Sequence, residues 1–340
     1  MALGARSARR GGGGLRWLAV GVVLTLLILL IDASLHSSSP GPAQQMATGA
    51  WVDRVLPIIN ESTQEGEQIA GIWAHGLTMK PTEVADQLGQ TGAAAAEAYH
   101  DVIGLRPPVA LAGAAGLLDA SLLARSEAAT QLRSALGPNA GSSPVSVIQS
   151  AGSHMQVGDS AYQLFAQSMP KSVPAMPPST WLADPAPYQP QAARIFLASF
   201  QSAGASNPVH KVEIYAVSTT PSPVSTQGTT QVLPDARAMT VTIVVANIGN
   251  QREKDLTVTA AISPSKGEST ARDFVDLQPG QAHTIVGLGP LNPPEGAPVT
   301  LTVTVTPAAG SPMPPATTTL VFSMPAPPPP TTTTAPASKH

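Results

Sequence analysis

The chain has 340 residues, a net charge of −3 and no cysteine, which excludes disulfide bonds, cysteine metal ligands, a lipid-modified cysteine anchor and thiol catalysis. Only 11% of the residues are charged and 4% are aromatic, against about 25% charged residues in an average globular protein. After the first 16 residues, 14 basic residues face 21 acidic ones, a balance that argues against a nucleic-acid partner.

Four arginines precede an uncharged apolar run at residues 17–31, and Asp32 follows it. The arginines are Arg6, Arg9, Arg10 and Arg16. This charge asymmetry predicts a cytoplasmic basic segment at residues 1–16, a transmembrane signal-anchor at residues 17–35 and an extracytoplasmic remainder in a single-pass protein. The alternative is a cleaved signal peptide with a mature end at Gln44, because an apolar run of this length also suits a signal sequence. The protein would then be secreted.

Proline divides the rest of the chain, with six of the 35 prolines before residue 138 and 29 from there onward. Because proline interrupts helices, helical structure is expected in the first part. After a linker at residues 36–50, we predict a small α-helical bundle over residues 51–169. Apolar residues at helical spacing predict helices at 51–77, 81–103, 109–136 and 145–169, the last interrupted near Asp159, which would cap its second half.

Residues 170–206 are predicted to be a proline-rich connector that ends in a short helix. From there to residue 324 the apolar pattern has a period of two, which is typical of strands. The clearest case is residues 299–305, where valine and leucine alternate with threonine. Strands are predicted at 212–217, 239–246, 256–262, 274–277, 283–288, 299–305 and 318–324. Seven short strands separated by turn residues predict an Ig-like antiparallel β-sandwich over residues 207–324.

Several turn and strand features carry a family resemblance: a strand at 240–247 followed by Gly249-Asn250, then Gln278-Pro279-Gly280 and a valine- and threonine-rich strand near the end. This part, roughly 110 of the 340 residues, resembles the bacterial cell-adhesion-related Ig-like modules of the CARDB type. The resemblance implies the sandwich fold and an extracytoplasmic setting. The whole layout also resembles uncharacterised actinobacterial membrane-anchored proteins. Residues 325–340 form a Pro/Thr-rich tail that is expected to be disordered.

Motifs for chemistry are sparse. Glu97 and His100 form an E-x-x-H pair beside Asp101, a spacing that di-iron helical proteins use twice together with two further carboxylates. The chain offers it once, so a solvated role is preferred over a metal. The seven histidines have no helical metal-ligand spacing, and no G-x-S-x-G, G-x-G-x-x-G or P-loop pattern occurs. We therefore expect no catalytic, cofactor-binding or metal-binding residue, and no enzyme.

Four aromatic residues are candidates for stacking on sugars: Trp51, Trp73, Trp181 and Tyr188. Trp51 and Trp73 fall on the apolar stripe of the first helix, so burial in the core is expected for both. Trp181 lies in the proline-rich connector, and it is the candidate expected to be exposed.

The preferred hypothesis is a non-enzymatic, membrane-anchored extracytoplasmic protein that acts in cell-envelope interaction or adhesion. Its partners would be the cell membrane, through the N-terminal helix, and an envelope protein or wall glycan. The alternative is an extracytoplasmic hydrolase or metal-binding protein that uses the helical half.

Overall fold

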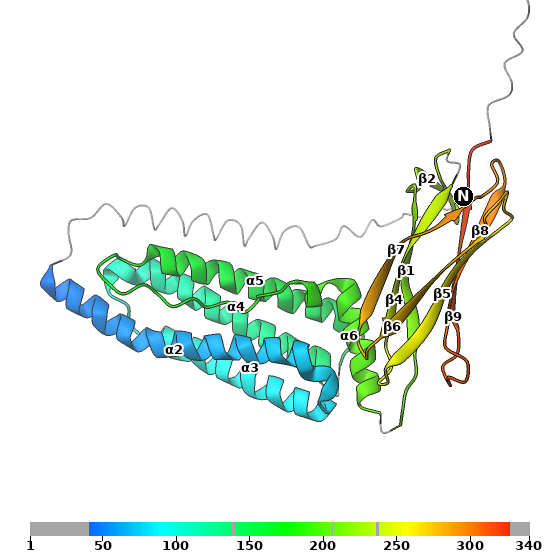
Figure 1. Ribbon diagram of the computed structural model, residues 1–340. Helices are drawn as coiled ribbons and strands as arrows, with labels where there is room; N and C mark the ends of the chain where they lie inside the picture. The colour runs from blue at the N-terminus through cyan, green and yellow to red at the C-terminus, as the bar shows by residue number, and fades with distance from the viewer. Residues whose placement is uncertain (1–40, 138–139, 206, 236–237, 327–340) are drawn as a thin grey trace, which may run out of the picture. The chain divides into compact units, whose positions relative to one another are not determined.

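A computed structural model describes residues 41–137, 140–205, 207–235 and 238–326, and shows an α plus β chain with a helical region followed by two β-sheets (Figure 1). The expected transmembrane segment at 17–35 and nearly all of the expected tail lie outside the described residues. The described chain divides into two compact units: residues 41–74 with Thr82–Tyr188, and His75–Pro81 with the chain from Gln189 onward. Each unit has its own core.

Four long helices build the first unit, and Figure 1 shows them lying lengthwise beside one another. They are α2 (Pro42–His75), α3 (Pro81–Gly104), α4 (Ala112–Leu136) and α5 (Pro144–Ser168), with the 3-10 turn η2 (Val109–Leu111). The 3-10 turn η1 (Gly76–Thr78) falls in the second unit. Buried residues of α2, α3, α4 and α5, among them Val55, Ala98, Leu118 and Phe165, form a common core. Helix α2 begins at Pro42, so it also takes in residues that the sequence pattern places in a linker.

Helix α5 is continuous, and the expected interruption near Asp159 is wrong. The sequence offered Gly158-Asp159 as a helix break and cap, but neither residue acts in that way. A Cβ atom at Gly158 would lie 3.0 Å from Cγ of Arg125 and 3.1 Å from the carbonyl oxygen of Ser121. The glycine therefore allows α5 to approach α4 closely, and Asp159 turns its carboxylate toward Arg125.

The segment Val109–Leu136, which includes η2 and α4, is the one helix in the described ranges that is long and apolar enough to cross a membrane, judged by length and composition alone. Half of its most apolar window is buried within the structure. Many of these buried positions are alanines, which bring neighbouring helices close together. Its apolar character thus matches that of a core helix.

The second unit contains two sheets. The three-stranded sheet has the order β1-β4-β7, and the six-stranded sheet has the order β2-β3-β9-β8-β5-β6. The strands are β1 (Val212–Thr220), β2 (Ser225–Gln227), β3 (Thr230–Val232), β4 (Met239–Asn247), β5 (Glu253–Ser263), β6 (Thr270–Leu277), β7 (Ala282–Leu291), β8 (Pro298–Thr306) and β9 (Ala316–Ser323). Each of the seven expected strands overlaps one of these. The short strands β2 and β3 were not expected, and β3 pairs with β9 in parallel, so the sheets are not antiparallel throughout.

The two sheets share a hydrophobic core to which both contribute alternate residues. On β8, Val299, Leu301, Val303 and Val305 are at most 1% exposed, whereas the intervening threonines are exposed or half-buried. Helix α6 (Pro190–Ala203) also belongs to this unit, where Ile195 packs against Ala246 and Ile248. The hydroxyl of Ser199 donates a hydrogen bond to the carbonyl of Asn247 over 3.2 Å.

Candidate functional site

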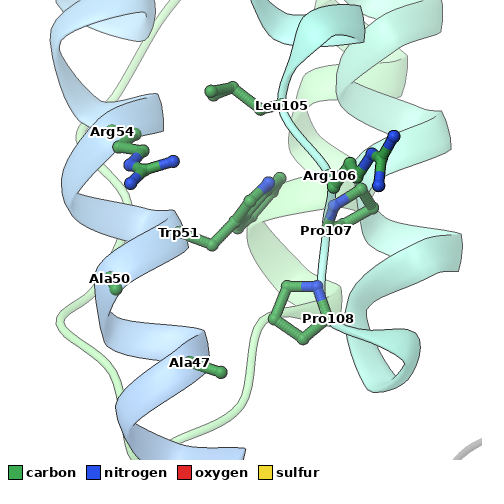
Figure 2. Close-up of a pocket in the computed structure, with 8 residues that line it drawn as sticks. All are labelled: Ala47, Ala50, Trp51, Arg54, Leu105, Arg106, Pro107 and Pro108. Carbon is green, nitrogen blue, oxygen red and sulfur yellow. The ribbon is translucent and has the colours of Figure 1, made fainter.

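A pocket of about 260 Å³ lies between the first turns of α2 and the connection from α3 to α4 (Figure 2). Its α2 wall is one face of the helix, because four lining residues are spaced at i, i+3, i+4 and i+7. The opposite wall is the extended segment that follows α3. The lining residues are Ala47, Ala50, Trp51 and Arg54 from α2, and Leu105, Arg106, Pro107 and Pro108 from the connection.

Two arginines supply the charge of this pocket. Figure 2 shows Arg54 on one side of Trp51 and Arg106 on the other. Neither guanidinium forms an ion pair or a hydrogen bond with the described residues, even though Asp53 directly precedes Arg54. A guanidinium presents its N–H donors in a planar fork that matches carboxylate and phosphate oxygens. The pocket is therefore built to attract an anion.

Trp51 separates the two arginines and joins the pocket to the core. It is 5% exposed, and its ring meets the ring of Phe165 edge-on, with the centroids 6.5 Å apart. The indole Nε1 is buried and has no hydrogen-bond acceptor among the described residues. A buried donor without an acceptor costs free energy on the order of 1–3 kcal/mol, so this ring is held by packing and not by hydrogen bonding.

Proline fixes the backbone of the second wall. Pro107 and Pro108 have restricted φ angles, and a residue before proline is kept out of the helical region. Pro108 has φ −54° and ψ 146°, an extended conformation. Arg106 is thus presented from a stiff segment, which limits the conformational entropy that it would lose on binding a ligand.

Two exposed apolar residues adjoin lining residues of the pocket in the sequence. Met46, next to the lining residue Ala47, is 71% exposed, and Val109, next to Pro108, is 94% exposed. Isolated exposed apolar residues are common on protein surfaces. Here each directly adjoins, in the sequence, a residue that lines the pocket.

A second polar cluster is buried inside the helical region, around Arg125 of α4. Arg125 is 1% exposed, and its Nη2 donates to Oδ1 of Asp159 on α5 over 3.0 Å. Its Nη1 donates to the hydroxyl oxygens of Ser62 and Ser179 over 3.2 and 3.0 Å. The guanidinium carbon lies 5.3 Å from the ring centroid of Tyr162. Such a charge is tolerated in the interior only because its partners replace water.

This cluster holds the proline-rich segment against the helices. The carboxylate of Asp159 accepts hydrogen bonds from the backbone N–H groups of Trp181 and Leu182 over 2.9 to 3.1 Å. The indole Nε1 of Trp181 donates to the carbonyl of Ser62 over 2.6 Å, and the ring lies 5.7 Å from the guanidinium carbon of Arg125. The segment is a fixed part of the first unit as far as Tyr188, whose hydroxyl accepts from Nε1 of Trp73 over 2.7 Å.

One acidic group of the cluster has no hydrogen bond. Glu65 of α2 is 3% exposed, and neither of its carboxyl oxygens has a partner among the described residues. The hydroxyl of Ser121 on α4 is in the same situation. Burial, assisted by the nearby charge of Glu61, raises the pKa of Glu65 to about 7, and Arg125 opposes this shift. Glu65 therefore changes its charge near neutral pH.

The E-x-x-H pair faces away from the core. Glu97, His100 and Asp101 are all exposed on α3, and the buried residue of that turn is Ala98. Among the described residues, no group of three or more histidine and acidic side chains is placed to hold a metal ion. A di-iron site needs inward-facing ligands from several helices, and this pair does not have that orientation.

The expectation for Trp181 is wrong: the side chain is 3% exposed and cannot stack on a sugar in solution. Proline content predicted an extended segment correctly, but extended structure can still be buried when its N–H groups find acceptors, as they do at Asp159. Tyr188 is also buried, at 7% exposure. Trp73 is only half-buried against Tyr188, so the expected burial of Trp73 in the core is wrong. Trp51 is in the core, as predicted.

Arg125 was not identified as a buried charge from the sequence, although the spacing of its neighbours indicates its burial. It falls on the buried stripe of α4 together with Leu118, Leu122, Ala129 and Leu132, at alternating spacings of four and three residues. A charge on such a stripe requires a buried counter-charge. Arg54 and Arg106 are 52 positions apart, and no local pattern links them.

Comparison with known proteins gives no assignment. No family model matches the sequence, and no curated protein matches it significantly.

Proposed function

We propose that this protein is a non-enzymatic, membrane-anchored extracytoplasmic protein that acts by binding components of the cell envelope. The observation that carries this proposal is the composition of the pocket. Its lining combines two arginines that have no partner among the described residues with Trp51, alanines, a leucine and prolines. The described lining includes no carboxylate, histidine, serine or other group able to act as an acid, base or nucleophile. Such a lining supports binding of an anion, and it offers nothing for hydrolysis.

The anchoring part of the proposal rests on residues 1–35. The four arginines before Trp17 and the uncharged run that follows favour a retained signal-anchor with the C-terminus outside the cytoplasm. The partners in this proposal are the membrane itself and an envelope protein or wall glycan.

The finer fold assignment is also part of the proposal. We assign the helical region to a small bundle, the two sheets to an Ig-like sandwich of the CARDB type, and the Pro/Thr-rich end to a disordered tail. Two sheets that share one core, with alternating buried residues on β8, support the sandwich assignment. Short strands joined by turns are typical of such extracytoplasmic domains.

A topology measurement tests the proposed location. A reporter that is active only outside the cytoplasm, fused after His340, should be active, and alkaline carbonate should leave the protein in the membrane pellet. An inactive reporter in a fusion protein that is present at full length would refute the proposal. Release of a mature protein that begins at Gln44 would show that the segment is a cleaved signal peptide and would remove the anchor from the proposal.

A further inference from the structure

We infer that the pocket between Arg54 and Arg106 binds the phosphate of an anionic phospholipid headgroup, which seats this end of the helical region on the membrane surface. The inference rests on the proposed function, because it takes the membrane to lie next to the start of α2. It goes further by naming the ligand of the pocket and the contact that the folded part makes with the bilayer.

The first step is charge. Arg54 and Arg106 line one pocket, and neither has an ion-pair or hydrogen-bond partner among the described residues. By contrast, Arg125 in the core and Arg252 on the surface are each paired with an aspartate. Two guanidinium groups without a partner among the described residues line one pocket and attract an anion, and each planar fork matches the oxygens of a phosphate.

The second step is size and surroundings. A pocket of about 260 Å³ is large enough for a phosphate with part of its glycerol. The remaining lining is apolar or aromatic, and Met46 and Val109, which adjoin lining residues in the sequence, are 71% and 94% exposed. Exposed arginines near exposed apolar side chains suit the boundary between headgroups and acyl chains. A free phosphate ion would make no use of these apolar neighbours.

The third step is position along the chain. Between the predicted anchor, which ends at residue 35, and the start of α2 at Pro42 lie only six residues, a reach of about 20 Å at full extension. The α2 residues of the pocket, from Ala47 to Arg54, fall within its first four turns. The pocket is therefore tethered close to the bilayer. Each basic residue near an anionic surface contributes about 1 kcal/mol of attraction.

The test uses the full chain purified in a neutral detergent, with bound lipid counted by native mass spectrometry. Short-chain phosphatidylglycerol, short-chain phosphatidylcholine and inorganic phosphate are titrated separately. We expect one molecule of phosphatidylglycerol to bind per chain, with a higher affinity than phosphatidylcholine has. The double variant Arg54→Gln, Arg106→Gln should weaken phosphatidylglycerol binding by at least tenfold, because charge-assisted hydrogen bonds are lost. Its melting temperature should stay unchanged, since neither guanidinium has an ion-pair or hydrogen-bond partner in the described part of the chain.

Arg272→Gln is the matched control, because it removes one exposed arginine from β6, outside the pocket. It should bind phosphatidylglycerol as the wild type does. Equal weakening in Arg272→Gln, unchanged binding in the double variant, or equal affinity for both lipids would each overturn the inference. If inorganic phosphate at equal concentration displaced the lipid completely, the pocket would be a site for free anions and the lipid assignment would fall. A failure of the proposed membrane anchor can be told apart from a failure of this inference, because carbonate extraction tests the anchor and does not depend on the two arginines.

Discussion

Arg125 and Asp159 form an ion pair in the interior of the helical region, with 3.0 Å between Nη2 and Oδ1 and side-chain exposures of 1% and 12%. The pair links α4 to α5, and Asp159 also accepts backbone N–H groups of Trp181 and Leu182. One carboxylate thereby neutralises a buried charge and fixes a proline-rich segment. Buried pairs of this kind stabilise little in comparison with an apolar pair, but they are costly to break.

Removing only the cation should therefore be more harmful than removing both charges. We expect Arg125→Ala to lower the free energy of unfolding of the helical region by about 3–5 kcal/mol, because Asp159 remains buried without its counter-charge. The double variant Arg125→Met, Asp159→Asn should lose less stability, since neither charge of the ion pair remains and the side-chain oxygen of the asparagine still accepts a backbone N–H. Urea denaturation followed by helical circular dichroism measures both. Equal losses would show that packing, and not charge, dominates at this position.

Glu65 should make stability fall as the pH rises. Burial raises its pKa to about 7, well above the ordinary value of a glutamate, so between these two pH values the folded state holds a proton that the unfolded state has lost. Protonated Glu65 therefore contributes fully to the free energy of unfolding below about pH 4.5. This contribution, on the order of 3 kcal/mol, is lost as the pH rises from there to about 7.

Glu65→Gln tests this pH dependence, because glutamine stays neutral. The variant should be more stable than the wild type at pH 8 and should lose the decrease in melting temperature that the wild type shows between pH 5 and pH 8. Glu67→Gln changes an exposed carboxylate two positions along the same helix, and it should keep the wild-type profile. A wild-type profile in Glu65→Gln would mean that another group titrates.

Two glycines of α2 test how tightly the proline-rich segment is seated. A Cβ atom at Gly66 would lie 2.8 Å from Cδ1 of Trp181 and 3.2 Å from the carbonyl oxygen of Thr180, whereas at Gly71 nothing lies within 4 Å. Gly71→Ala should stabilise the helix by about 0.5–1 kcal/mol. Gly66→Ala should destabilise by about 1–3 kcal/mol through overpacking, and it should speed proteolysis near Trp181. If both variants were stabilising, the segment would not be packed against α2 in solution.

The two faces of β8 differ in their tolerance of charge. Val303 is 1% exposed and lies in the core between the sheets, while its neighbour Thr302 points the other way and is half-buried. Val303→Asp should cost several kcal/mol, because an unpaired charge would be buried, which is a large part of a typical domain stability of about 5–15 kcal/mol. Thr302→Asp should be nearly neutral. Loss of a cooperative thermal transition in both variants would contradict the assignment of the two faces.

The sequence by itself predicted the four long helices and the seven longer strands, because local periodicity and punctuation decide such elements. It missed the short strands β2 and β3 and the first turns of α2. Helical spacing over 109–136 and 145–169 matches α4 and α5, and strict alternation at 299–305 matches β8. Proline and glycine mark most of the ends. Helical periodicity, strand alternation and turn residues all depend on interactions between residues a few positions apart, so they can be recognised in the local sequence.

Only the tertiary structure decided the buried cluster and the pocket. Arg125 and Asp159 are 34 positions apart, and Trp181 reaches back to Ser62 over 119 positions. The local sequence favoured Asp159 as a cap and Trp181 as an exposed aromatic, but long-range hydrogen bonds and burial outweigh those local preferences, since buried polar groups must find partners wherever the chain supplies them. Arg54 and Arg106 share a pocket for the same reason: packing of α2 against the end of α3 brings them together, and nothing in either local sequence requires it.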